Sequence, residues 1–273
     1  MGYYITVEKN VDIYVHDVGP RDGKPILFLH GWPLNNTVFE YQYDQLPKLG
    51  FRCIGIDLRG FGKSDKPWTG YTYDRLADDV RVVIENLRID NITLAGHSMG
   101  GAIAIKYMAR HRGYKVCKLA LLAAAAPVFT KRPGYPYGLT DLTKEDVNKL
   151  ITQTYNDRPE MISEFGKMFF YQPVSDSFMN WFGGLALEAS GNATAMTAVS
   201  LRDAELWQEM SMIQVPTGIF HGVHDEICPF SLAEAMHEGI QGSELIPFMN
   251  SGHGLFYCEM DKFNHELARF IDQ

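Results

Sequence analysis

The sequence lacks any continuous run of 18 apolar residues, and its first residues lack the basic stretch and apolar core of a secretory signal. Positive charge is also scarce, because 25 Lys and Arg residues stand against 33 Asp and Glu residues, for a formal net charge of −8. These absences argue against a membrane span, a secretory leader and a basic surface for nucleic acid. We therefore expect a soluble cytoplasmic protein with neither membrane nor nucleic-acid partners.

Cysteine is also sparse, with four residues at Cys53, Cys117, Cys228 and Cys258. They lie far apart, and none forms a C-x-x-C pair. This spacing is typical of reduced, mostly buried thiols in a cytosolic protein rather than of a disulfide framework.

What the chain does have is an alternation of strand and helix patterns over 273 residues, enough for one large core. Residues 11–18 alternate polar and apolar side chains, as a half-buried strand does. Near-continuous apolar runs follow at 25–30, 51–57, 91–96 and 116–124. Such runs suit parallel strands that are covered on both faces. The order of strands and helices predicts an α/β protein with a doubly wound, mostly parallel sheet.

The pattern changes from about Val128 to Leu206, where helical segments continue without strands. Strand patterns resume at 215–222 and 242–249, each followed by a helix. A helical block inserted into a strand–helix alternation predicts a lid over one edge of the sheet.

The stretch GHSMG, residues 96–100, has the form G-x-S-x-G between a predicted strand and a predicted helix. In that context Ser98 fits a nucleophile held on a turn so tight that bulky residues at 96 and 100 would clash. The alternative is an ordinary turn in which Ser98 caps the following helix. This stretch alone leaves both interpretations open.

A serine nucleophile needs a base, and the base needs an orienting acid. Asp225 follows one of the later strand patterns and His253 follows the next, in the chain order Ser, Asp, His that such a fold requires. Asp57 also ends a strand but precedes Ser98, so we interpret it as ordering the loop after it.

Two further groups of residues bear on the chemistry. Backbone N–H groups of Trp32 and Met99 could hold an oxyanion, whereas Pro33 has no N–H.

His221, His224 and Cys228 surround the proposed acid and raise the alternative of a metal site. Their spacing fits no standard zinc pattern, so no metal is expected.

With these motifs in place, the chain resembles an α/β-hydrolase over nearly its whole length. The segments HGWP, GIDLRGFGKSDKP, GHSMGG, HGVHDEICPF and SGHG occur in family order. The chain resembles more closely the bacterial aryl esterase and cofactor-free haloperoxidase (perhydrolase) group, which includes a γ-lactamase. The resemblance implies an eight-stranded, mostly parallel sheet flanked by helices, with a helical cap inserted after the sixth strand. The expected core is 1–127 and 207–273, and the expected cap is 128–206.

The resemblance also implies roles for particular residues. Ser98, Asp225 and His253 would form the catalytic triad, and the N–H groups of Trp32 and Met99 the oxyanion hole. The same group places four residues near the acyl pocket, namely Phe129, Phe165, Ile227 and Phe230. The chain departs from several members at His97, where they carry phenylalanine, a change that leaves the triad intact and bears on fine specificity.

The expected activity is that of a serine carboxylesterase acting on short-chain acyl or aryl esters through an acyl-enzyme, with no metal or organic cofactor. Perhydrolase or haloperoxidase activity and γ-lactamase activity are alternatives on the same triad. A non-catalytic binding protein with this fold is a further alternative, disfavoured because no triad member is missing. The expected partner is a small-molecule ester, and the sequence leaves the oligomeric state open, a homo-oligomer included.

Overall fold

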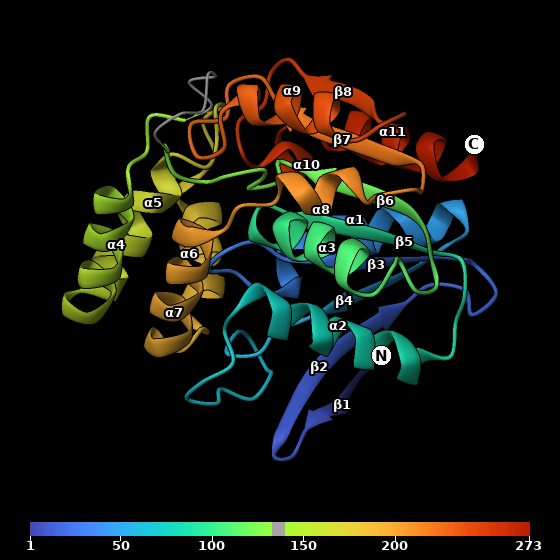
Figure 1. Cartoon of the computed structure of the whole chain (residues 1–273), viewed down its shortest axis with the longest axis horizontal. Helices are drawn as coiled ribbons and strands as arrows, with labels where there is room; N and C mark the ends of the chain where they lie inside the picture. The colour runs from blue at the N-terminus through green and yellow to red at the C-terminus, as the bar shows by residue number, and fades with distance from the viewer. Residues whose placement is uncertain (133–139) are drawn as a thin grey trace.

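The computed structural model describes residues 1–132 and 140–273, and its strands there form one sheet (Figure 1). The strands are β1 (Gly2–Glu8), β2 (Val11–Val18), β3 (Lys24–Leu29), β4 (Phe51–Ile56), β5 (Ile92–His97), β6 (Val116–Leu122), β7 (Thr217–Gly222) and β8 (Glu244–Phe248). Their order is β1-β2-β4-β3-β5-β6-β7-β8. Only the β1–β2 and β2–β4 pairings in this sheet are antiparallel. The eight-stranded, mostly parallel sheet confirms the predicted fold class.

Burial along the strands follows the hydrophobic patterns in the sequence. In β2 every second residue is fully buried, so one face packs on the core and the other is partly exposed. In β4, β5 and β7 every residue is buried, because helices cover both faces of the parallel part. The apolar runs therefore mark the strands that carry the site at their carboxyl ends.

Helices cover both faces of the sheet (Figure 1). The helices α2 (Tyr73–Leu87), α3 (Met99–Arg110), α8 (Trp207–Ser211) and α9 (Phe230–Gly239) contact one another in series, and α10 (Leu255–Cys258) leads into α11 (Met260–Asp272). On the other face, α11 packs with α1 (Glu40–Gln45) through a hydrogen bond of 3.2 Å from Gln42 to Asn264. Among the described residues, no helix is both long and apolar enough to span a membrane.

A block of helices lies between β6 and β7, to one side of the sheet in Figure 1. It comprises α4 (Lys144–Asn156), α5 (Arg158–Lys167), α6 (Asp176–Leu187) and α7 (Gly191–Asp203), and we call these four helices the cap helices. Each begins at a capping side chain that accepts a backbone N–H of the first turn. The four capping residues are, in chain order, Thr143, Asp157, Ser175 and Ser190. Residues 133–139 of the expected cap lie outside the described residues.

The cap helices and the described segments that join them, which together we call the cap region, are attached to the loops at the carboxyl ends of the parallel strands. The indole N–H of Trp32 donates to the carbonyl of Thr194 in α7 at 2.8 Å, and the N–H of Gly254 donates to the carbonyl of Phe169 at 3.0 Å. The cap therefore borders the edge of the sheet at which the predicted site residues lie.

Candidate active site

Ser98 occupies the turn between β5 and α3 with φ 54° and ψ −119°. A positive φ is strained for a residue with a side chain, and such strain is concentrated at functional sites. The turn is held by main-chain bonds: Ser98 N–H donates to Leu122 at 2.9 Å, and its carbonyl accepts from Gly101 and Ala125. The serine side chain makes no capping bond to α3. The helix-capping alternative for Ser98 is therefore wrong.

The two glycines of the motif are required by close approach of the backbone. A Cβ on Gly96 would lie 2.6 Å from the carbonyl carbon of Gly100 and 2.7 Å from the Cα of Gly101. A Cβ on Gly100 would lie 2.7 Å from the carbonyl oxygen of His30. These spaces admit no side chain, as the motif predicted, so α3 begins directly against the end of β3.

Asp225 and His253 meet on the loops that follow β7 and β8. The Nδ1–H of His253 donates to Oδ2 of Asp225 at 2.7 Å, and both side chains are buried. The other carboxylate oxygen, Oδ1, accepts the backbone N–H groups of Ile227 at 2.9 Å and Cys228 at 2.8 Å. The carboxylate is thus fixed from both sides, and the Nε2 of a neutral His253 is left with a free lone pair.

The loop that carries His253 is tied to its surroundings by main-chain bonds. His224 N–H donates to Ser251 at 3.1 Å, which joins the two loops, and Gly254 N–H donates to Phe169 in the cap region. The ring of Phe169 also lies edge-on to the His253 imidazole, with centroids 4.8 Å apart. No sequence motif marks Phe169 as a residue that contacts the proposed base, because it comes from a segment far from His253 in the chain.

Asp57, the competing acid, is engaged elsewhere. Its Oδ1 accepts the backbone N–H of Asn36 at 2.8 Å, and its Oδ2 accepts that of Lys63 at 2.8 Å. Its main-chain carbonyl accepts the Ser64 hydroxyl at 2.5 Å. The carboxylate orders the loop after β4, in agreement with the interpretation from the sequence.

The two expected oxyanion donors lie at neighbouring strand ends, because β3 and β5 pair in parallel with Leu29 opposite Gly96. A Cβ on Gly31 would lie 2.9 Å from the Cβ of Ser98, so the Gly31–Trp32 turn is adjacent to the nucleophile turn. Within residues 1–132 and 140–273, the backbone N–H groups of Trp32 and Met99 donate no hydrogen bond to a protein acceptor. Two unpaired donors next to a serine are what an oxyanion requires.

The two histidines near Asp225 make different contacts. His221 donates Nε2–H to the Cys228 carbonyl at 2.7 Å and lies 3.5 Å from Oδ2 of Asp225. Burial lowers the pKa of His221, so the imidazole is neutral. His224 is exposed and stacks on Tyr171 with ring centroids 3.8 Å apart. The described part of the chain contains no cluster of three or more His, Cys, Asp or Glu side chains placed to hold a metal ion.

A cavity of about 340 Å³ opens between the cap region and the Asp225 loop. Three of the four residues expected at the acyl pocket line it, namely Phe129, Phe165 and Ile227. Phe165 also packs edge-on against the Trp32 indole, with centroids 5.1 Å apart, which places the cavity wall beside the oxyanion turn. Phe230 follows Pro229, which lines the cavity, but its own ring packs against His221 at 5.9 Å.

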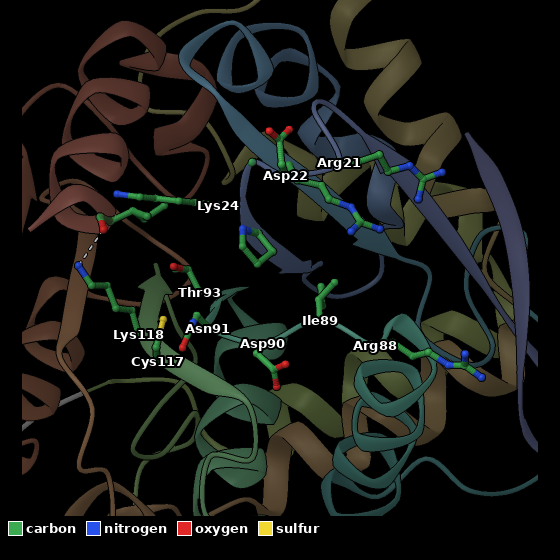
Figure 2. Close-up of a pocket in the computed structure, with 14 residues that line it drawn as sticks. Arg21, Asp22, Lys24, Arg88, Ile89, Asp90, Asn91, Thr93, Cys117 and Lys118 are labelled. Carbon is green, nitrogen blue, oxygen red and sulfur yellow. Dashed lines mark hydrogen bonds between the residues drawn. The ribbon is translucent and has the colours of Figure 1, made fainter.

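A larger cavity, of about 490 Å³, lies at the amino ends of β3, β5 and β6 (Figure 2). Its lysines are already bonded, Lys24 to Asp272 at 2.7 Å and Lys118 to the carbonyls of Phe270 and Ile271. The side chains of Arg21 and Arg88 point away from it in Figure 2. No sequence-predicted site residue lines this cavity, so the candidate chemistry lies at the opposite edge of the sheet.

Comparison with known proteins shows the family to which the fold belongs. A family model described as the alpha/beta hydrolase fold matches residues 24–259. The chain is 54% identical to an AB hydrolase superfamily protein of Bacillus subtilis (strain 168), over 99% of each chain. It is 32% identical to a bifunctional esterase/perhydrolase of Acinetobacter calcoaceticus, over 98% of this chain and 99% of that one. An esterase from Exiguobacterium antarcticum has a solved structure with a TM-score of 0.95 and 46% identity, with all of both chains covered.

Proposed function

The chain belongs to the α/β-hydrolase fold family, and we propose that within it the protein is a serine carboxylesterase that hydrolyses short-chain acyl or aryl esters through an acyl-enzyme. The resemblance to the esterase and perhydrolase group that the sequence indicated is confirmed by the matches. The observation that carries the proposal is the strained Ser98 turn at the same edge of the sheet as the bonded Asp225–His253 pair. The experiment that tests it is replacement of Ser98, argued in the Discussion.

The proposed reaction begins with attack of Ser98 Oγ on the ester carbonyl, while Nε2 of His253 takes the hydroxyl proton. Asp225 favours the resulting imidazolium because its carboxylate already accepts Nδ1–H. The N–H groups of Trp32 and Met99 hold the oxyanion of the tetrahedral intermediate. His253 then gives its proton to the leaving alcohol, and the acyl group stays on Ser98. A water then bonds to the acyl carbon as it loses a proton to His253. The ester bond to Ser98 breaks, the acid leaves, and His253 returns the proton to Ser98 Oγ.

Hydrogen peroxide as the acyl acceptor is a second candidate, because a relative of this chain is named a bifunctional esterase/perhydrolase. In that step peroxide replaces water, its oxygen bonds to the acyl carbon, and the Ser98 ester bond breaks to give a peracid. The ratio of peracetic acid to acetic acid formed from an acetate ester at a fixed peroxide concentration measures the partition between the two acceptors. A peracetic acid yield at the level of the uncatalysed background would exclude perhydrolysis and leave hydrolysis untouched.

The non-catalytic alternative is tested by covalent labelling. A serine-directed phosphonate reacts with a serine that an adjacent base activates, so we expect a single adduct on Ser98 by peptide mass spectrometry. A protein that folds correctly but takes up no label at Ser98 would be a binding protein, and the enzymatic proposal would fall.

Location and partners remain proposals. The four cysteines form no disulfide, which supports a reducing compartment and hence the cytoplasm. We propose a small-molecule ester as the partner of the site, with the segment 128–206 as its cap. No cofactor enters the proposed reaction.

A first prediction concerns the space between the oxyanion turn and the nucleophile turn. Gly31→Ala would place a methyl group 2.9 Å from the Ser98 Cβ and 2.7 Å from the His97 Nδ1, so one of the two turns must move. We expect kcat/KM for p-nitrophenyl acetate to fall about 10²-fold, the cost of a misplacement of about 1 Å in an active site. Gly184→Ala is the matched control. Its Cβ would meet open space in the cap helices, so kcat/KM should stay at the wild-type value. Equal activity of the two variants would show that the Gly31 turn does not form the oxyanion site.

A second prediction concerns the length of the acyl chain. The cavity of about 340 Å³ is walled mainly by apolar side chains, so we expect it to take an acyl chain only up to the length at which the chain meets the wall. Each methylene that fits contributes roughly 0.8 kcal/mol from burial, and the next one meets a close-packed wall. We expect kcat/KM to be highest between acetate and butyrate esters and to fall sharply for longer chains.

Removal of a wall should move that optimum. We expect Phe129→Ala and Phe165→Ala to favour longer esters, whereas Tyr155→Ala, an exposed aromatic residue of α4, should keep the wild-type optimum. The measurement is kcat/KM over a series of p-nitrophenyl esters from two to sixteen carbons. Preference of the wild-type enzyme for palmitate would overturn the prediction, because it would require an open tunnel.

A further inference from the structure

One buried imidazole at the site has no part in the reaction proposed above. His97 is the last residue of β5, directly before Ser98, and its side chain is fully buried. Its ring centroid lies 4.7 Å from that of His253 and 5.0 Å from that of Phe256. It therefore lies between the nucleophile turn and the loop that carries the proposed base.

The hydrogen bonding of His97 determines its tautomer. Its Nε2 lies 3.2 Å from the main-chain carbonyl oxygen of His253, and a carbonyl can only accept, so Nε2 carries the hydrogen. Its Nδ1 is buried with no partner among the described residues, and a Cβ on Gly31 would lie 2.7 Å from it. Burial, followed by the nearby His253, holds the pKa of His97 well below its usual range. His97 is thus a neutral donor with a single hydrogen bond.

That hydrogen bond joins two loops of the site whose strands are not neighbours in the sheet. Ser98 follows β5 and His253 follows β8, and the strands β6 and β7 lie between them. Two main-chain bonds tie the His253 loop to its neighbours: His224 N–H, on the loop after β7, donates to Ser251, and Gly254 N–H donates to Phe169 in the cap region. The bond from His97 instead ties the main chain of the base to the residue next to the nucleophile.

We propose that His97 is a positioning residue for ester hydrolysis: its Nε2–H holds the His253 main chain against the nucleophile strand, so that the His253 imidazole faces Ser98. The inference rests on the proposed function, because it concerns the distance between the proposed nucleophile and its base. It assigns His97 no proton transfer and no contact with substrate.

The test compares His97→Phe with His97→Gln. Phenylalanine keeps a ring in the apolar space and removes the donor, whereas the glutamine amide nitrogen is as many bonds from Cα as Nε2 and can still donate to the His253 carbonyl. We expect His97→Phe to lower kcat about tenfold or more with KM unchanged, on a scale where about 1 Å of misplacement costs 10²-fold. We expect His97→Gln to retain kcat within about threefold of wild type while melting at the same or a lower temperature than His97→Phe.

A purely structural role makes the opposite prediction. If His97 only filled space, phenylalanine would equal or exceed glutamine in both kcat and melting temperature, and that result would overturn the proposal. If neither variant folds, the wild-type tautomer decides, because long-range ¹H–¹⁵N spectra of ¹⁵N-histidine-labelled protein report which nitrogen of His97 carries the hydrogen. An Nδ1–H tautomer would also overturn it. Absence of hydrolysis and of Ser98 labelling in the wild-type protein would instead refute the proposed function itself.

Discussion

Ser98→Ala is expected to abolish ester hydrolysis while the protein stays folded. The strained turn is held by main-chain bonds to Leu122, Gly101 and Ala125, none of which uses the hydroxyl. The hydroxyl makes no capping bond either, so its removal should leave the melting temperature nearly unchanged. Loss of the serine nucleophile costs about 10⁶-fold in kcat in the serine-protease case, and we expect a loss of that order here.

The measurement is kcat for p-nitrophenyl acetate, together with circular dichroism and a thermal melt. Ser211→Ala, on the exposed end of α8, is the matched control and should keep wild-type kcat. A Ser98→Ala enzyme with a native spectrum and near wild-type kcat would refute the assignment of the nucleophile. If the variant does not fold, phosphonate labelling of the wild-type protein tests the same assignment. An adduct on a residue other than Ser98 would refute it.

The fold could be predicted from the sequence because its signals are local. The near-continuous apolar runs at 51–57 and 91–96 correspond to β4 and β5, in which every residue is buried. The helix α2 begins after Thr72, whose side chain accepts the N–H of Arg75, and its apolar residues repeat at helical spacing. Each of these signals needs only a few neighbouring residues.

The site was predictable in part for the same reason. The order of Ser98, Asp225 and His253 places all three at carboxyl ends of parallel strands, where the structure brings Asp225 and His253 into contact at 2.7 Å. Whether Ser98 is a helix cap could not be decided from the motif, since both alternatives need the same residues. The decision depends on a backbone φ of 54° and on a side chain that makes no capping bond.

Two other contacts between distant segments could not be predicted from the sequence. The bond from His97 to His253 joins residues 156 positions apart, and the Trp32 indole reaches Thr194 in α7 across 162 positions. No periodicity or spacing in the sequence predicts such pairs, because they depend on how the cap region and the loops pack at the edge of the sheet. Phe230, expected near the acyl pocket, does not line the cavity beside Phe129 and Phe165, and its ring packs against His221.

The same edge of the sheet offers two aspartates, and their different hydrogen bonds predict different outcomes of the same substitution. Asp225→Asn is expected to lower kcat about 10⁴-fold, as loss of the orienting carboxylate does in the serine-protease template. An asparagine amide that donates toward His253 Nδ1 would favour the wrong imidazole tautomer, leaving Nε2 protonated and unable to accept from Ser98. The variant should still fold, because the asparagine oxygen can keep one or both bonds from the N–H groups of Ile227 and Cys228.

Asp57→Asn is the control, for which we expect lower stability and an unchanged kcat. Its carboxylate accepts backbone N–H groups from both Asn36 and Lys63 on different oxygens, and one of these acceptors is lost when an amide replaces it. A hydrogen bond to a charged group contributes about 1.5–3 kcal/mol, so the free energy of unfolding should fall by that order while kcat per folded molecule stays near wild type. The two variants therefore separate catalysis from stability in one experiment that measures kcat and urea unfolding side by side. A catalytic loss at Asp57 with a nearly silent Asp225→Asn would mean that the acid of the triad is Asp57, and it would contradict the assignment that the 2.7 Å contact between Asp225 and His253 supports.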